Sequence, residues 1–331
     1  DYRLELGFAH GNLGSVREAR GDLTGAADAY SLTLDVKRSL VEMEPANIDR
    51  IGELAESHNK LGVVLRKAGS YAAALEQHTR EFELRQAIAE MDPQHAYWRE
   101  RFAVALGFFA EVMMATGELD ESLALRTRQV ALLDSLVGAD PSNTVRQRNR
   151  ASVSRARGGL LVELGRFDEA EHALDLAERE MRRLVAADST AFGWHADLAW
   201  VLAVKTALHL DRGSPGDALE SATTAVALLR DEVPQTTSRA TVVARAHLAR
   251  GNALDGLGRS GEAREAWALA VAVLAPHAAA GDQSELRPLM AELLLRLDRP
   301  EDASRELQAL RSSGYVDRKL DALASRKGAP G

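Results

Sequence analysis

Cysteine is absent from this chain of 331 residues, and so are long apolar runs. The absence of cysteine excludes disulfide bonds and thiolate metal sites, and it fits either an oxidising or a reducing compartment. No apolar run approaches the roughly 20 residues that a helix needs to cross a bilayer, so we expect no membrane insertion by this segment. The net charge of −8 does not attract phosphate backbones. Nucleic acid is therefore not an expected partner.

Alternation of polar and apolar residues at period two, the mark of a half-buried strand, is also missing over any useful length. Leucine, alanine, valine and phenylalanine instead recur at spacings of three and four, which is typical of helices with one buried face. The pattern is clear in Leu123, Leu125, Val130, Leu132, Leu133 and Leu136. The sequence therefore predicts an all-α protein.

One position recurs along the whole chain at a nearly constant interval. Five glycines are spaced 48 residues apart, a sixth follows after 45, and an aspartate takes the same place after a further 40. These residues are Gly21, Gly69, Gly117, Gly165, Gly213, Gly258 and Asp298. A glycine after a helix accepts the left-handed conformation that closes the helix, and aspartate approximates it at some cost. The interval predicts seven helix-turn-helix hairpins.

Two further marks share this register. Small residues flank each turn five positions after it, as Ala26 and Ala74 do, and seven positions before it, as Gly14 and Gly62 do. Small side chains let the two helices of a hairpin cross closely. The second mark is an acidic residue followed by proline, as in Asp92-Pro93, which ends a helix. We therefore expect about fourteen helices in antiparallel hairpins at about 1–44, 45–92, 93–140, 141–188, 189–235, 236–277 and 278–312.

The twelve-residue spacing of Gly62 and Ala74 around a glycine turn resembles the tetratricopeptide repeat, as in NKLGVVLRKAGSYAAALEQH and ARGNALDGLGRSGEAREAWALA. The resemblance covers nearly the whole chain and implies a right-handed superhelical α-solenoid. The usual repeat has about 34 residues, whereas this one has 48. Fourteen extra residues make nearly four helical turns, so each helix should have about 18–21 residues.

The connector Asp140-Pro141-Ser142-Asn143 and the long unit look like arrays fused to bacterial signalling proteins, most of all the C-terminal extension of eukaryotic-like serine/threonine kinases. Winged-helix regulators and STAND-type ATPases carry similar arrays. A kinase attachment would imply a membrane span upstream and a periplasmic array, and the other two would imply the cytoplasm. The segment itself has no glycine-rich phosphate loop, HRD or DFG motif.

The two ends differ. Asp1 aligns with Asp49, so the chain begins in mid-pattern, although an array needs a cap on its first apolar face. We expect that the native protein continues upstream, or that a partner or a second copy covers that face. At the other end, we expect a disordered tail at 326–331. A capping helix at 313–325 should cover the final hairpin with Tyr315, Val316, Leu320 and Leu323.

Catalytic and metal sites are not expected. The histidines follow the repeat, as His10 and His58 do at a separation of 48, and have no carboxylate or cysteine at ligand spacing. No nucleophile elbow of the G-x-S-x-G type occurs. We therefore expect no enzyme activity in this segment, no metal and no cofactor.

The resemblance implies that the first helix of each hairpin lines a concave groove, at positions two, five, six, nine and twelve of the motif. A peptide in that groove could place an apolar anchor near Phe108 and an acidic group near Arg155. Long helices also pack more of their surface against neighbours, so the apolar members are alternatively core. Carried onto this chain, the groove residues are Phe8, Asn12, Glu56, Asn59, Lys60, Val104, Phe108, Met114, Arg148, Ser152, Arg155, Trp200 and Val204.

A dense basic stretch contains Arg146, Arg148, Arg150, Arg155 and Arg157. These residues form either a site for phosphate or an acidic peptide, or ion pairs with carboxylates of adjacent helices, which is the usual role of a charge run. We interpret the chain as a non-catalytic protein-interaction scaffold in a larger bacterial signalling protein. Self-association and effector sensing for an attached winged-helix regulator or STAND-type ATPase are the alternatives.

Overall fold

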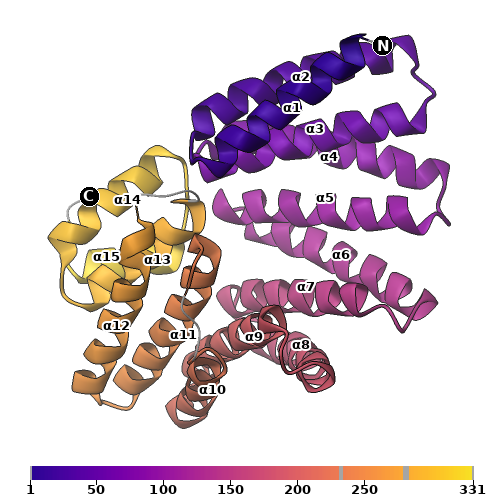
Figure 1. The fold of residues 1–331 in the computed structure, drawn as a ribbon. Coiled ribbons are helices and arrows are strands. Elements are labelled where there is room, and N and C mark those ends of the chain that lie inside the picture. Colours follow the sequence, from indigo (N-terminus) through magenta and orange to yellow (C-terminus); the bar gives the residue numbers. More distant parts are fainter. Residues whose placement is uncertain (1, 231–233, 279–282, 330–331) are drawn as a thin grey trace. The chain divides into compact units, whose positions relative to one another are not determined.

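The computed structural model describes residues 2–230, 234–278 and 283–329. Within these residues the chain forms α-helices and one short 3-10 helix, and no β-strand (Figure 1). The predicted all-α class is confirmed. The helices are α1 (Tyr2–Ala19), α2 (Leu23–Met43), α3 (Ile48–Lys67), α4 (Tyr71–Met91), α5 (Ala96–Ala115), α6 (Leu119–Ala139), α7 (Thr144–Glu163), α8 (Phe167–Ala187), α9 (Phe192–Asp211), α10 (Pro215–Leu228), α11 (Thr237–Gly256), α12 (Ser260–Leu274), η1 (Ala275–His277), α13 (Gln283–Arg296), α14 (Pro300–Ser312) and α15 (Arg318–Arg326).

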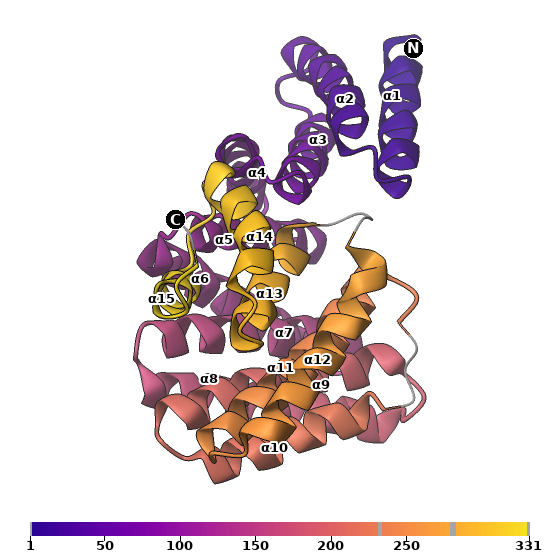
Figure 2. The same cartoon turned by 90° about the vertical axis from the view of Figure 1, so that its left-hand side faces the viewer.

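The chain divides into two compact units. In unit 1 each helix packs on the next from α1 to α5. In unit 2 helices α7 to α12 do the same, and Figure 2 shows α9, α10, α11 and α12 as neighbouring rods. Unit 1 comprises Asp1–Leu132, Ala280–Ser284 and Leu310–Val316, and unit 2 comprises Leu133–Ala279, Glu285–Ala309 and Asp317–Gly331.

The predicted turn glycines close their helices in the left-handed conformation. At Gly69, φ is +78°, and the Ser70 N–H donates to the Leu65 carbonyl at 2.8 Å, which satisfies a carbonyl at the end of α3. The other turns repeat this bond. Asp298 has a φ of 57° and is the one non-glycine residue with a positive φ among those described. Positive φ values also occur at Gly21, Gly117, Gly165, Gly213 and Gly258.

In four hairpins the small residue before the turn is a glycine that makes room for a specific large side chain. A Cβ atom added to Gly158 would lie 2.7 Å from the Leu174 side chain, which is far inside van der Waals contact. The same spacing of sixteen residues joins Gly14 to Tyr30, Gly62 to His78 and Gly251 to Trp267. Glycine therefore lets the second helix bring a bulky residue directly onto the backbone of the first.

Helix length follows the expectation only in the first part of the chain. Helices α1 to α9 have 18 to 21 residues, whereas α10, α12, α13 and α14 have 14, 15, 14 and 13. The predicted length is wrong for these four helices. The turn interval falls to 45 and then 40 residues in this region, so less chain is available for each hairpin.

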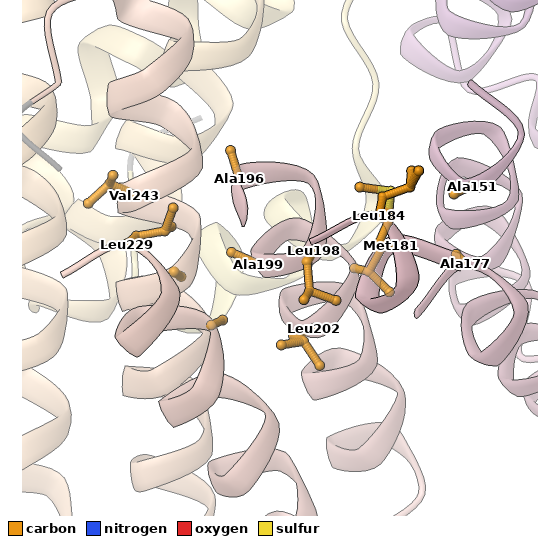
Figure 3. Close-up of a cluster of buried hydrophobic side chains, with 13 residues drawn as sticks. Ala151, Ala177, Met181, Leu184, Ala196, Leu198, Ala199, Leu202, Leu229 and Val243 are labelled. Atoms are coloured by element: carbon orange, nitrogen blue, oxygen red, sulfur yellow. The ribbon is translucent and has the colours of Figure 1, made fainter. Parts of the chain in front are cut away.

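Each unit has its own apolar core. In unit 2, Met181 and Leu184 of α8 lie beside Leu198 and Leu202 of α9 (Figure 3). In unit 1, α2, α3 and their neighbours bury Ala26, Tyr30, Leu34, Leu54, Leu61 and Val64. These buried faces explain the apolar periodicity of three and four.

The C-terminal segment differs from the expectation. Tyr315 and Val316 were expected to cover the final hairpin, but both lie in unit 1 against earlier turns. The Val316 N–H donates to the Ala115 carbonyl at 2.8 Å, and the Tyr315 ring lies 5.7 Å from that of Tyr71.

Helix α15 belongs to unit 2, where Leu320, Leu323 and Ala324 are buried. Lys319 pairs with Asp211 at the end of α9 at 2.9 Å, so α15 reaches an earlier hairpin as well. The tail expected from residue 326 overlaps this helix, which ends at Arg326 and whose Lys327 N–H donates to the Leu323 carbonyl. Residues 330 and 331 lie outside the described residues.

Two glycines in unit 2 provide a matched test of the close helix crossing. Gly158→Ala is expected to lower the free energy of unfolding by about 1–3 kcal/mol, because Leu174 must move. Gly138→Ala, where an added Cβ meets nothing within 4 Å, should raise it by up to about 1 kcal/mol through helix propensity. Urea unfolding followed by circular dichroism measures both, and equal effects would contradict the assigned packing.

Two buried histidines predict a pH dependence of stability. Burial lowers the pKa of His58 from 6.5 against the opposing hydrogen bond with Gln77, and burial and the charge of Arg250 lower the pKa of His247. Below pH 6.5 the unfolded chain therefore binds more protons at these two histidines than the folded chain does. Their contribution to the free energy of unfolding is complete above pH 6.5 and declines as the pH falls below it.

The urea midpoint should accordingly fall between pH 7.5 and 5.5, and less steeply in a His58→Gln, His247→Gln double variant. His172→Gln, at an exposed position of α8, controls for the loss of a histidine in general. A double variant with the wild-type slope would show that other groups cause the dependence.

Candidate functional site

The first helices of three consecutive hairpins lie side by side in unit 2. Helix α9 packs against both α7 and α11. Residues of α7 and α9 that are 45 positions apart meet: Arg155 contacts Trp200, and Val204 is 3.8 Å from where a Cβ of Gly159 would lie. The fold thus brings together three of the expected groove residues, Arg155, Trp200 and Val204.

Two arginines converge on the Trp200 indole. The Arg155 guanidinium carbon is 3.7 Å from the centre of the ring, and that of Arg245 is 5.3 Å from it. All three side chains are half-buried. Because they come from α7, α9 and α11, three packed helices hold their positions. We call Arg155, Trp200 and Arg245 the arginine–tryptophan row.

Arg245 was not among the residues expected from the sequence. Within the described residues it has no hydrogen-bond or ion-pair partner, and its Nε is buried. Its contact with Trp200 repeats the 45-residue separation of Arg155 and Trp200. For Trp200 and Arg245 that separation equals the interval between Gly213 and Gly258, so the motif position of Trp200 carried onto the sixth hairpin gives Arg245.

Arg148 and Ser152 lie on α7 on the side of Arg155, and both are half-buried. The Arg148 Nε donates to a carboxylate oxygen of Asp197 on α9 at 2.5 Å. Arg148 is therefore held by the adjacent helix, and its charge is neutralised there. Ser152 leaves a small polar surface between the two arginines.

Most of the basic stretch is used in ion pairs. Arg146 pairs with Asp140 at 3.6 Å, and Arg150 pairs with Glu180 at 2.5 Å. The hydrogen bond to Glu180 raises the pKa of Arg150 above its ordinary value. The ion-pair interpretation thus describes Arg146, Arg148 and Arg150. It does not describe Arg245 or Arg157, for which the described residues supply no carboxylate.

The expected groove residues of unit 1 fall into two groups. Phe8, Asn12, Lys60, Val104 and Met114 are exposed. The Phe8 ring carries the Lys37 ammonium 4.5 Å from its centre. No contact joins these five residues into one cluster within the described part of unit 1.

Glu56 and Asn59, by contrast, are tied to neighbouring helices. Glu56 accepts hydrogen bonds from Arg85 of α4 and Arg101 of α5. The Asn59 amide donates to Glu81 of α4 at 2.9 Å. These side chains hold α3, α4 and α5 together.

Phe108 also belongs to this packing. Its ring stacks on that of His78, with 5.4 Å between centres and 8° between planes. His78 is completely buried and shares Glu81 with Asn59. Phe108 is therefore half-buried and takes part in helix packing, whereas Val104 and Met114 of the same helix are exposed.

Metal and membrane sites do not emerge from the described residues. Over these parts of the chain, no three His, Asp or Glu side chains gather in a way that could hold a metal ion. Over the same parts, no helix combines the length and apolar character of a membrane span.

No protein-family model matches the chain, and no curated protein matches it. Solved structures do match. BtubC from P. vanneervenii is similar over 77% of this chain and 91% of its own, with 15% identity and a TM-score of 0.56. A Rap protein complexed with Competence and Sporulation Factor is similar over 98% of this chain and 99% of its own, with 13% identity and a TM-score of 0.50.

A tetratricopeptide repeat protein from Parabacteroides merdae is similar over 98% of this chain and 99% of its own, with 14% identity and a TM-score of 0.46. At these identities the likeness concerns the fold alone. The helices and their glycine turns, together with the likeness to BtubC and the Rap protein, give the chain an α-solenoid fold of helix hairpins. The relation to kinase-attached arrays stays a prediction.

Proposed function

We propose that this chain is a non-catalytic scaffold that binds a protein or peptide on the first helices of its hairpins. The observation that carries the proposal is the arginine–tryptophan row. Tryptophan and arginine are the residues that most often dominate binding energy at protein interfaces. Here three adjacent helices fix them while their side chains stay partly open to solvent.

The row is suited to binding because its side chains are already held in place before a ligand binds, so binding loses little side-chain entropy. The guanidinium of Arg155 already rests on the Trp200 ring, so its long side chain is held in place. Val204, one helical turn further along α9, adds a half-buried apolar surface. An extended ligand on this face meets cationic, aromatic and apolar contacts in turn.

Within this role, we assign the chain to the sensor or regulatory region of a larger bacterial signalling protein. The resemblance of its long repeat and its Asp140-Pro141-Ser142-Asn143 connector to arrays of serine/threonine kinases supports that assignment. In that case it faces the periplasm. With a winged-helix regulator or a STAND-type ATPase, it lies in the cytoplasm.

Self-association is the second candidate, and an apolar surface of α1 favours it. Tyr2, Leu13 and Val16 of α1 are 78%, 43% and 48% exposed. Exposed apolar side chains on one helix are a common basis for association between copies. Sedimentation equilibrium decides the matter, because a monomer at micromolar concentration excludes strong self-docking.

Peptide binding is tested by selecting random twelve-residue peptides displayed on phage against the immobilised chain. Val204→Glu, which places a charge on the proposed face, should weaken the selected peptides at least tenfold. Leu269→Glu on α12 is the matched control, since Leu269 is 51% exposed and outside that face. Selection of no peptide, or equal weakening by both variants, would contradict the proposal.

A further inference from the structure

We propose that the arginine–tryptophan row recognises the carboxylate side chains of an acidic peptide segment. This inference rests on the proposed function and narrows its ligand to one chemical class. Three observations carry it: an arginine without a carboxylate among the described residues, a ring beside which two guanidinium groups lie, and the neutralisation of an acidic residue on the same helix as the ring.

The first observation concerns Arg245. The chain has 49 acidic and 41 basic residues, so carboxylates are in excess. Other cations of unit 2 use that excess: Arg212 binds Asp168 and Glu171, and Lys205 binds Asp175 and Glu178. Arg245 has no such partner among the described residues. A half-buried arginine without an anion leaves charged donors incompletely satisfied, and an incoming carboxylate would satisfy them.

The second observation is the geometry at Trp200. A guanidinium lying against a ring keeps its N–H donors in its own plane, at its edge. For Arg245 these donors stay available to a two-oxygen acceptor, because the described residues supply no carboxylate to them. Arg155 at 3.7 Å and Arg245 at 5.3 Å share one indole, so the open donors of Arg245 lie beside a second positive charge.

The third observation is the charge of the surroundings. Asp197 lies one turn before Trp200 on α9 and would repel an acidic ligand if it were free. Its carboxylate instead accepts from Arg148. The half-buried Ser152 and Val204 beside the row are uncharged. The local surface is therefore cationic although the chain as a whole carries a charge of −8.

The test measures the binding of fluorescein-labelled hexaglutamate by fluorescence anisotropy, with hexaglutamine as the neutral probe. Arg155→Gln and Arg245→Gln should each raise the Kd about tenfold, and Arg245→Lys should raise it by less, because it keeps the charge and loses the planar fork. Arg182→Gln removes the same charge from an exposed position of α8 and should change the Kd less than twofold. Circular dichroism checks the fold of each variant.

Three outcomes overturn the inference. Hexaglutamine binding as tightly as hexaglutamate excludes charge recognition. Arg182→Gln weakening binding as much as Arg245→Gln shows that net charge alone is sensed. A phosphoserine peptide binding more than tenfold tighter than hexaglutamate assigns the row to phosphoryl groups instead.

The phage selection distinguishes a failure of the proposed binding function from a failure of the carboxylate assignment. If phage selection gives peptides whose binding is sensitive to Val204→Glu but which lack acidic residues, the scaffold role stands and the carboxylate assignment falls. If selection gives no peptide for this face, the binding role itself falls. Selected peptides with acidic residues whose affinity depends on Arg155 and Arg245 support both.

Discussion

The closeness of two helices at one crossing point decides how each hairpin is built. Where the first helix has glycine, the second sets a bulky residue on its backbone, as Leu174 does over Gly158. Where the first helix has Thr206, the residue at the same spacing is only Ala222. At least one side chain of each pair is small, so the helices stay at contact distance and the glycine turn can join them. The apolar cores and the contacts of α9 with α7 and α11 both depend on this packing.

The same constraint explains how much of the fold the sequence predicts. The turn glycines, the small crossing residues and the Asp-Pro connectors are backbone requirements, and each leaves a distinct residue type at a fixed place. The helical class and the turn positions could therefore be predicted, including the substitution of Asp298 for glycine. The shortening of α10, α12, α13 and α14 was missed because the turn marks give the length of a hairpin but not how that length is shared between helices and connector.

The candidate site was predicted only in part, for a related reason. Position in the motif identifies which side chains face the neighbouring first helices, and this was sufficient for Arg155 and Trp200. Whether such a side chain stays accessible depends on what the neighbouring helices supply. Phe108 meets the buried His78, and Asn59 meets Glu81, so helix packing uses both. Arg245 could have been found from the sequence, because it stands thirteen residues before Gly258 as Trp200 stands thirteen before Gly213, but the groove positions were carried only as far as the fifth hairpin.

The hydrogen bond from Val316 to Ala115 has a consequence for the order of events during synthesis. Helical arrays usually gain stability from neighbouring repeats alone, so each hairpin can settle soon after it leaves the ribosome. Here the Ala115 carbonyl at the end of α5 accepts its hydrogen bond from Val316, which is 201 positions later in the chain. At typical elongation rates that delay is roughly 10 to 40 seconds. Unit 1 is therefore complete only after residue 316 has been synthesised, so its folding ends long after its first hairpins have been made.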